Sequence, residues 1–288
     1  MFIYLNKEII RLEDARISPL DHGFLYGVGL FETFRVYDGH PFLLDDHLVR
    51  LNEGLAELQI CYKLSREEVM NILKDVLAAN DLQNAYIRLN VSAGNGEIGL
   101  KTDDYLEPNT IIFIKPVPNF SKEKQGLVVS TVRNTPEGTT RLKSHHYLNS
   151  IYAKREVGEN PQIEGLLLNK EGYLTEGVTS NLFWVKDGAI YTPSLETGIL
   201  NGITRQFVFS IACKLGYRVH EGLYTVKDLE SCEEAFVTNS IQEIVPLNTI
   251  NSVPVRGSEG NVTRELKRLY EQERMHLWSR DHLTGRVE

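Results

Sequence analysis

The sequence predicts a mixed α/β (α+β) protein with a smaller N-terminal lobe and a larger C-terminal lobe. The chain has 288 residues, which is enough for about two domains at ~150 residues each. Strand-like and helix-like patterns follow one another along its length, as they do in α/β and α+β folds. Residues 115–126 contain two prolines and no periodicity, which is typical of an interdomain connection. We therefore expect domains at 1–118 and 127–288, joined by a linker at 119–126.

The N-terminal lobe is expected to alternate strands and helices. Alternating or short apolar segments predict strands at 33–37, 86–91 and 110–114. Leucines at helical spacing predict a helix through Leu48, Leu51, Leu55 and Leu58. A second helix is expected to begin at Ser65, because Glu68 three residues later completes the pattern of a capping box.

The C-terminal lobe shows the same two kinds of pattern. Strands are expected at 127–132, 166–169, 182–185 and 190–192, the last two joined by a tight turn at Asp187-Gly188. Helices are expected at 204–215 and 262–278. A further helix should start just after Lys143, with Leu148, Ile151 and Tyr152 on its inner face.

Composition and charge exclude several classes of protein. The chain carries 31 Lys and Arg against 39 Asp and Glu, a formal net charge of -8, which is the opposite balance from a nucleic-acid binder. No apolar run approaches the ~20 residues of a membrane span, and the polar Asn6-Lys7-Glu8 argues against a secretory signal. The three cysteines are widely spaced and form no CxxC pair, so we expect neither a disulfide framework nor zinc, and a cytoplasmic location.

Common catalytic motifs are missing from the sequence. It contains no GxGxxG, no GxxxxGK[ST], no GxSxG and no HExxH. His145 and His146 are adjacent, so on a helix they would point about 100° apart and could not easily share a metal ion. We interpret them as surface or packing residues and expect no metal site.

Polar residues at the junctions of strands and helices are the remaining candidates. Lys143 precedes a helix and could be a desolvated nucleophile, although an isolated lysine is usually a surface charge. Residues 201–204 and 238–240 could each bind an anion near a helix start or a strand end, or could be ordinary caps and turns. Glu176 could pair with a buried cationic nitrogen or lie in an exposed loop. Arg50 could bind phosphate or lie on a solvated helix face. Together these residues suit a phosphorylated aldehyde cofactor held as a Schiff base.

Several segments resemble, in matching order, the fold-type IV pyridoxal-phosphate enzymes. They are Leu20–Gly27 with Gly29–Thr33, His47–Leu51, Lys143-Ser144, Glu176-Gly177 with Ser180-Asn181, and Gly202–Arg205. This class includes branched-chain aminotransferases, D-amino-acid aminotransferases and 4-amino-4-deoxychorismate lyases. The resemblance runs from end to end and implies a homodimer in which pyridoxal 5'-phosphate lies between the two lobes of each chain.

The resemblance also implies roles for particular residues. Lys143 would form the Schiff base and act as general base, and Glu176 would pair with the pyridine nitrogen. The cofactor's phosphate would be held by Arg50, Ser180, Ile203, Thr204 and Thr238. We further expect substrate contacts from Phe31, Thr33, Arg88 and Asn239, although Arg88 could equally be paired inside the small lobe.

Within the class, the sequence is most similar to aminodeoxychorismate lyases of the Bacillus type. The similarity lies in Phe31–Arg35, Arg133–Gly138, Arg141–Asn149 and Tyr152–Glu156. D-amino-acid aminotransferases carry an Arg-x-His pair after the strand at 86–91, and Ser92–Leu100 lacks it. The implied reaction converts 4-amino-4-deoxychorismate, a dicarboxylate, to pyruvate and the folate precursor 4-aminobenzoate. Two alternatives stay open: an aminotransferase of branched-chain or D-amino acids, and a cofactor-free binding protein on the same scaffold.

Overall fold

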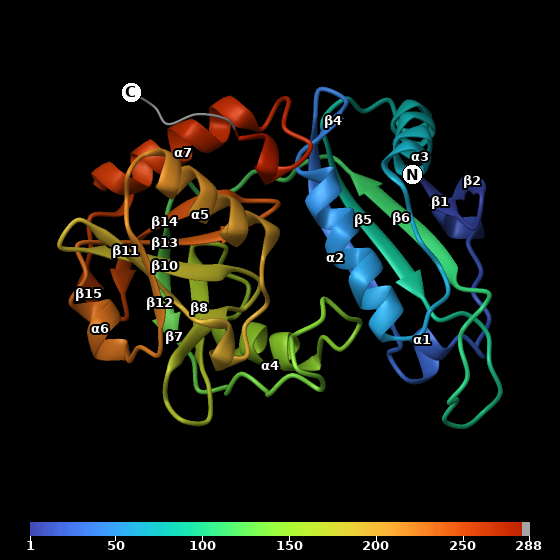
Figure 1. Ribbon diagram of the computed structural model, residues 1–288, viewed down its shortest axis with the longest axis horizontal. Coiled ribbons are helices and arrows are strands. Elements are labelled where there is room, and N and C mark those ends of the chain that lie inside the picture. The colour runs from blue at the N-terminus through green and yellow to red at the C-terminus, as the bar shows by residue number, and fades with distance from the viewer. Residues whose placement is uncertain (284–288) are drawn as a thin grey trace. The chain divides into compact units, whose positions relative to one another are not determined.

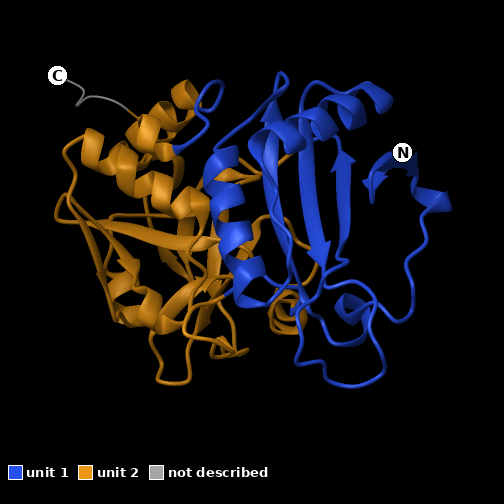
Figure 2. Ribbon diagram, turned by 45° about the vertical axis from the view of Figure 1, so that its right-hand side comes forward, with its two compact units in different colours: residues 1–118, 142–146, 274–279 blue, residues 119–141, 147–273, 280–288 orange. Residues whose placement is uncertain are grey.

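The computed structural model describes residues 1–283, and the chain divides into two compact units (Figure 2). Unit 1 comprises residues 1–118, 142–146 and 274–279, and unit 2 comprises 119–141, 147–273 and the residues from 280 onward. The first boundary follows Pro118. The chain then returns twice to unit 1, so a single linker at 119–126 does not describe the division. No helix among residues 1–283 is long and apolar enough to span a membrane.

Unit 1 is built on an antiparallel six-stranded sheet with the order β2-β1-β6-β5-β3-β4. Its strands are β1 (Phe2–Leu5), β2 (Glu8–Arg11), β3 (Gly29–Tyr37), β4 (His40–Pro41), β5 (Ala85–Ser92) and β6 (Asn109–Lys115). Its helices are α1 (His22–Leu25), α2 (Leu44–Glu57), α3 (Arg66–Ala79) and the 3-10 turn η1 (Leu12–Asp14). The leucine stripe of α2 and the apolar face of α3 form the core with one face of this sheet (Figure 1).

The expected elements of unit 1 are present, with two differences. Ser65 caps α3, because its Oγ accepts a hydrogen bond from the Glu68 amide at 3.2 Å. β3 begins at Gly29, four residues earlier than expected, since its first residues pair fully with β5. The β1–β2 hairpin was missed, because it turns through Asn6 and Lys7, which adopt positive φ without a glycine.

Unit 2 contains a nine-stranded sheet whose main path is β12-β11-β10-β13-β14-β7-β8-β9. The strands are β7 (Lys124–Val128), β8 (Ile163–Leu168), β9 (Leu174–Gly177), β10 (Asn181–Lys186), β11 (Ala189–Pro193), β12 (Val219–Gly222), β13 (Glu234–Asn239), β14 (Glu243–Ile250) and β15 (Val253–Pro254). β15 pairs with β14, and β9 also pairs with β10 through Glu176 and Asn181. Because of this last pairing, the strands from β10 through β13, β14, β7 and β8 to β9 form a closed ring. The turn between β10 and β11 has positive φ at Asp187 and Gly188, as its sequence predicted.

The helices of unit 2 are α4 (Leu148–Val157), α5 (Ile203–Lys214), α6 (Val226–Glu230) and α7 (Asn261–Glu273), with 3-10 turns at η2 (Leu195–Thr197), η3 (Gly257–Glu259) and η4 (Arg280–His282). α5 and α7 pack against each other and against the sheet near β13 (Figure 1). α7 ends five residues before Trp278, where the predicted helix ended, because residues 274–279 belong to unit 1. β7 lies at 124–128 rather than 127–132, so it begins inside the expected linker.

The orientation of α4 differs from the prediction. Leu148, Ile151 and Tyr152, expected on the inner face, are 61%, 42% and 52% exposed. The buried residues are Ser150, Ala153 and Val157. Small side chains on this face let the helix lie close to β8, which it contacts. The apolar residues of α4 therefore did not predict which side of this short helix is buried. With this exception, the predicted mixed α/β organisation in two lobes is confirmed.

Candidate active site

Lys143 lies in an extended segment of unit 1 that pairs with the start of β3. The Phe31 amide donates to the Lys143 carbonyl at 3.0 Å, and the His145 amide donates to the Gly29 carbonyl at 3.0 Å. α4 starts only at Leu148, so Lys143 is five residues before the helix. The side chain extends over β3, with Nζ 4.6 Å from the centre of the Phe31 ring. Backbone pairing at Lys143 and His145 fixes the point on β3 from which the Lys143 side chain extends.

Three predicted substrate residues lie beside this lysine on one face of the sheet. Phe31 and Thr33 are two residues apart on β3, and Arg88 on β5 is the pairing partner of Thr33. The guanidinium carbon of Arg88 is 3.8 Å from the centre of the Phe31 ring. Arg88 Nε donates to Asn90 Oδ1 at 3.0 Å. The structure thus places Lys143 and Arg88 against the same aromatic ring, and Arg88 Nε donates to an amide oxygen.

Arg50 is engaged by a buried carboxylate that the sequence analysis did not single out. Its Nε donates to Glu32 Oε1 and its Nη2 to Glu32 Oε2, each at 2.7 Å. His47 Nδ1 lies 2.6 Å from Glu32 Oε2. Burial raises the pKa of Glu32, but Arg50 and His47 outweigh it and hold that pKa at about 2. Burial lowers the pKa of His47, so a neutral His47 donates to an ionised Glu32. A phosphate contact by Arg50 stays a prediction.

Glu176 is a buried carboxylate of unit 2 whose two oxygens are both held. Arg133 Nε and Nη2 each lie 2.8 Å from Oε1. Asn181 Nδ2 and the Leu200 amide donate to Oε2 at 3.2 and 3.1 Å. These donors hold the carboxylate in a fixed direction, as pairing with a cationic ring nitrogen requires. The loop alternative for Glu176 is wrong, because the residue is on β9 and 5% exposed.

Sequence reasoning missed the partners of Glu176. Arg133 lies 43 residues before it, and is itself held by Asn149 Oδ1 at 2.9 Å. Arg141 lies in the same neighbourhood, and burial followed by the charge of Arg133 lowers its pKa to about 10. Arg133 could have been found from the segment Arg133–Gly138, which is one of the segments that resemble the family. The resemblance assigned no role to this arginine.

At the start of α5, a hydroxyl of the helix meets a hydroxyl from a distant segment. α5 begins after Gly202, which provides no side-chain cap, so the amides of its first turn are available to a ligand. Thr204 Oγ1 lies 3.3 Å from Ser240 Oγ, in the turn after β13. Thr238 is 1% exposed, and its Oγ1 has no hydrogen-bond partner within the described part of the chain. A helix N-terminus and an unsatisfied buried hydroxyl are what a phosphate group would complete.

The other two residues predicted at this place have local partners. Ser180 Oγ donates to Glu164 Oε1 at 2.7 Å. Asn239 Oδ1 accepts from the amides of Ile241 and Gln242 at 3.0 and 2.7 Å, so it orders the turn after β13. The predicted group therefore separates into two kinds of residue. Thr204 contacts Ser240 and Thr238 has a buried hydroxyl without a partner among the described residues, whereas Ser180 and Asn239 have local partners.

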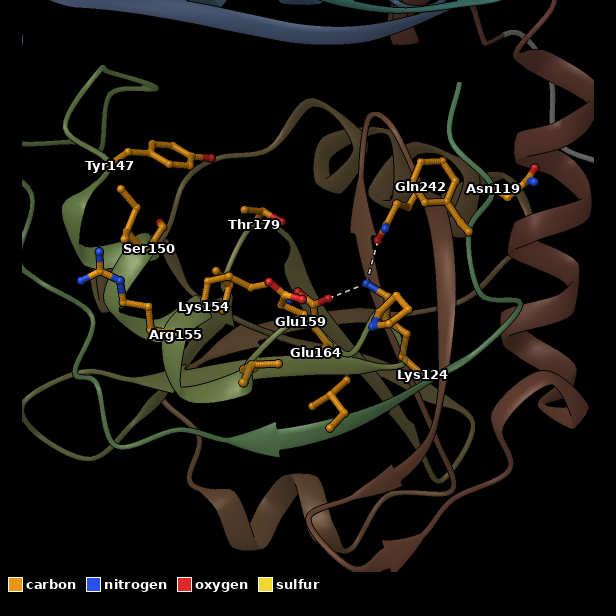
Figure 3. A pocket seen from close by; sticks show the side chains of 17 residues that line it. Asn119, Lys124, Tyr147, Ser150, Lys154, Arg155, Glu159, Glu164, Thr179 and Gln242 are labelled. Carbon is orange, nitrogen blue, oxygen red and sulfur yellow. Dashed lines mark hydrogen bonds and ion pairs between the residues drawn. The ribbon is translucent and has the colours of Figure 1, made fainter. Parts of the chain in front are cut away.

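Unit 2 also contains a cavity of about 610 Å³ between α4, the start of β8 and Gln242 (Figure 3). At one side Lys124 Nζ donates to Glu164 Oε2 at 2.7 Å and to Gln242 Oε1 at 2.9 Å, as Figure 3 shows. Tyr147, Ser150, Lys154 and Arg155 line the opposite side. Among the described residues that line it there is none of those predicted for the catalytic or binding site.

The comparisons with known proteins identify the family of the chain. The family model of class IV aminotransferases matches residues 29–250, so the chain belongs to the class IV aminotransferase family. It is 46% identical over 275 residues to the aminodeoxychorismate lyase of Bacillus subtilis (strain 168), which covers 94% of each chain. The predicted family resemblance is confirmed.

Two solved structures show the same fold. The branched-chain amino acid aminotransferase of Escherichia coli is 30% identical, covers 95% of this chain and 94% of its own, and superposes with a TM-score of 0.84. The T.th. branched-chain amino acid aminotransferase complexed with N-(5'-phosphopyridoxyl)-L-glutamate is 28% identical, covers 99% and 98%, and has a TM-score of 0.84. Family membership identifies pyridoxal 5'-phosphate as the cofactor.

Proposed function

We propose that the chain is a pyridoxal-phosphate-dependent lyase that converts 4-amino-4-deoxychorismate to 4-aminobenzoate and pyruvate. One observation carries the proposal. Identity to a lyase is 46% over 94% of both chains, whereas identity to the branched-chain aminotransferase of Escherichia coli (strain K12) is 30% over 93% of this chain. Both comparisons span nearly the whole chain, so the difference reflects the sequence throughout and not one shared motif.

Different residues of the chain have different roles in this reaction. When bound, pyridoxal 5'-phosphate supplies a carbonyl that joins the substrate's amine and a ring that accepts electron density. Lys143 Nζ provides the amine that holds the cofactor and then takes the proton from C4 of the substrate. Glu176, oriented by Arg133, stabilises positive charge at the pyridine nitrogen. Thr204, Thr238 and the first turn of α5 hold the phosphate.

The reaction balances without another reactant. The C–H bond at C4 breaks, with its proton passing to Lys143 Nζ, and the C–O bond to the enolpyruvyl group breaks as the ring becomes aromatic. The departing enolpyruvyl group gains one proton and becomes pyruvate. No oxidant or reductant is needed, because substrate and combined products have the same composition. Formation of the aromatic ring supplies the driving force.

Substrate recognition must work against the charge of the protein. The substrate carries two carboxylates and the chain has a formal net charge of -8, so binding depends on local cations. Arg88 is suited to this role, because its charge lies on the Phe31 ring beside Lys143. Phe31 and Thr33 would contact the substrate ring from the same sheet face. The predicted contact of Asn239 would come from the backbone, since its side chain is used in the turn.

The proposal includes two further sequence-based expectations, a homodimer and a cytoplasmic location. All three cysteines are free thiols, which supports a reducing compartment. Analytical ultracentrifugation tests the dimer, and cell fractionation tests the location. A monomer at micromolar concentration would overturn the first expectation.

A product assay separates the candidate functions. The purified protein, loaded with pyridoxal 5'-phosphate, is incubated with 4-amino-4-deoxychorismate, and 4-aminobenzoate is measured by its fluorescence. Amine transfer to 2-oxoglutarate without any aromatic product would instead identify an aminotransferase. A protein that takes up no cofactor and stays unlabelled after borohydride reduction would support the binding-protein alternative.

A further inference from the structure

His145 is a largely buried imidazole that neither the family comparison nor the proposed function uses. Its ring stacks on Phe31, with ring centres 6.3 Å apart and an angle of 26° between the planes. The ring also lies directly against Gly29, where a Cβ atom would be 2.5 Å from Cε1 and Nδ1 of the imidazole. A glycine at position 29 is therefore needed for the ring to lie in this place. The sequence analysis interpreted His145 as a surface or packing residue.

One nitrogen of this ring has no partner in the part of the chain that the structure describes. His145 Nε2 is buried and has no hydrogen-bond partner among the described residues. A buried polar atom without a partner destabilises the fold, and a ring that served only for packing would gain from an apolar replacement. Such an atom points instead to a group that arrives with a ligand.

The charges around the ring keep it neutral. Burial, and then the positive charge of Arg88, lower the pKa of His145 to about 4. Asp21 acts in the opposite direction, as does the Leu30 carbonyl, and His146 on the same segment lowers that pKa further. A neutral imidazole has one N–H, which either nitrogen can carry. Because Nε2 has no partner, the hydrogen bond with the Leu30 backbone uses Nδ1. An acceptor placed at Nε2 would select the other form, in which Nε2 is the donor and the bond to Leu30 is given up.

The Phe31 ring is the common support of three nitrogen-bearing side chains. Lys143 Nζ lies 4.6 Å and the Arg88 guanidinium carbon 3.8 Å from its centre, and the His145 ring stacks on it. A substrate whose amine reaches Lys143 must therefore lie beside this ring. Its carboxylate would meet the cation of Arg88 and the unsatisfied nitrogen of His145 together.

We propose that His145 contacts the substrate and donates a hydrogen bond from Nε2 to a carboxylate oxygen, beside Arg88. The inference rests on the proposed lyase function, because it takes a carboxylate-bearing ring as the ligand. It assigns His145 a part in substrate specificity that a packing residue would not have.

The chain provides a matched control in the next residue. His146 is exposed, and its Nε2 lies 3.2 Å from the Tyr26 carbonyl. The variants are His145→Ala, His145→Gln and His146→Ala, each as holoenzyme. Gln has a side-chain N–H near the place of Nε2, so it tests the hydrogen bond separately from the ring. Calorimetry measures the Kd of 4-aminobenzoate and of aniline, which has the same ring and amine without the carboxylate.

His145→Ala should weaken 4-aminobenzoate binding about tenfold, the effect of losing one hydrogen bond to a charged group. Aniline binding and the visible absorbance of the bound cofactor should not change, and KM should rise more than kcat falls. His145→Gln should recover much of the affinity, and His146→Ala should stay within about twofold of wild type. Equal losses for aniline and 4-aminobenzoate, no recovery by Gln, or equal effects at the two histidines would each overturn the inference. A wild-type protein that forms no 4-aminobenzoate would instead overturn the proposed function, and the inference with it.

Discussion

The guanidinium of Arg50 and the carboxylate of Glu32 form a bidentate salt bridge, with both N···O distances at 2.7 Å. Glu32 is 1% exposed and lies on β3, whereas Arg50 is on α2. The pair therefore ties the helix to the sheet from the side opposite Phe31. Because consecutive residues of a strand face opposite sides, β3 presents Phe31 and Thr33 to one side and Glu32 to the other.

Replacement of Glu32 by Gln should destabilise unit 1. The change leaves Arg50 without its carboxylate in a buried setting, and loss of one partner of a buried pair costs about 3–5 kcal/mol. Urea unfolding at pH 7 measures this as a lower free energy of unfolding. Glu53→Gln, an exposed position on the same helix, is the control and should change stability by less than about 0.5 kcal/mol.

The difference between wild type and Glu32→Gln should depend on pH. The pKa of Glu32 is held at about 2, below its usual value of 4.5. A carboxyl group with a lowered pKa stabilises the folded state above its unfolded pKa, and this contribution is lost as pH falls toward the folded pKa. The free-energy gap between the two proteins should therefore be constant above about pH 5 and shrink between pH 4.5 and 2. A gap that stayed constant down to pH 3 would contradict the role given to Glu32.

Arg50→Ala should weaken cofactor binding as well as stability. The family resemblance assigns Arg50 to the phosphate, and the structure adds the pair with Glu32. Glu32→Gln retains the arginine and so separates the two effects. Titration of the cofactor-free proteins with pyridoxal 5'-phosphate should give a weaker Kd for Arg50→Ala than for Glu32→Gln. Equal affinity in Arg50→Ala and wild type would show that Arg50 has only the structural role.

The local signals in the sequence predicted the local structure well. Ser65 with Glu68, and Asp187 with Gly188, each specify a cap or a turn within four residues, so these features depend little on distant contacts. The leucine stripe of α2 predicted its buried face for the same reason. In α4 the first apolar residues are exposed and small residues are buried, because contact with β8 determines which side of the helix packs inward. A helix of ten residues is too short for its sequence pattern to predict that side.

Distant pairings lay beyond the reach of pattern analysis. The segment of Lys143 returns to β3 across more than 110 residues through two backbone hydrogen bonds, which no side-chain pattern records. Arg133 and Glu176 are 43 residues apart, and each alone has the sequence context of an ordinary surface charge. The family resemblance supplied Lys143, Glu176, Thr204 and Thr238, and the structure supplied their supports, Arg133, Asn181 and Ser240.

Arg133→Ala should reduce turnover through Glu176. The substitution removes both donors to Glu176 Oε1, so the carboxylate can rotate away from the pyridine nitrogen. Misplacement of a positioned group costs roughly 10- to 100-fold in rate. We expect a fall of that size in kcat together with a shift in the absorbance of the bound cofactor. Arg155→Ala, at an exposed arginine of α4, should leave both unchanged, and a similar loss there would refute the positioning role of Arg133.

Thr238→Val should weaken cofactor binding without destabilising the protein. Thr238 Oγ1 has no hydrogen-bond partner within the described residues, so Val removes no internal bond and keeps the side-chain shape. A hydrogen bond to a charged phosphate contributes about 1.5–3 kcal/mol, which corresponds to a Kd for pyridoxal 5'-phosphate raised about tenfold or more. Urea unfolding of the cofactor-free protein should be unchanged.

Thr175→Val provides the opposite control for this prediction. Thr175 is also fully buried, but its Oγ1 donates to the Leu167 carbonyl at 2.8 Å. Val at that position leaves a buried carbonyl without its donor, so the cofactor-free protein should lose roughly 1–3 kcal/mol of stability. Its Kd for pyridoxal 5'-phosphate should stay near that of wild type. Thr238→Val should therefore lose cofactor affinity and keep its stability, whereas Thr175→Val should do the reverse. If Thr238→Val lost as much stability as Thr175→Val, Thr238 would support the fold and not the phosphate.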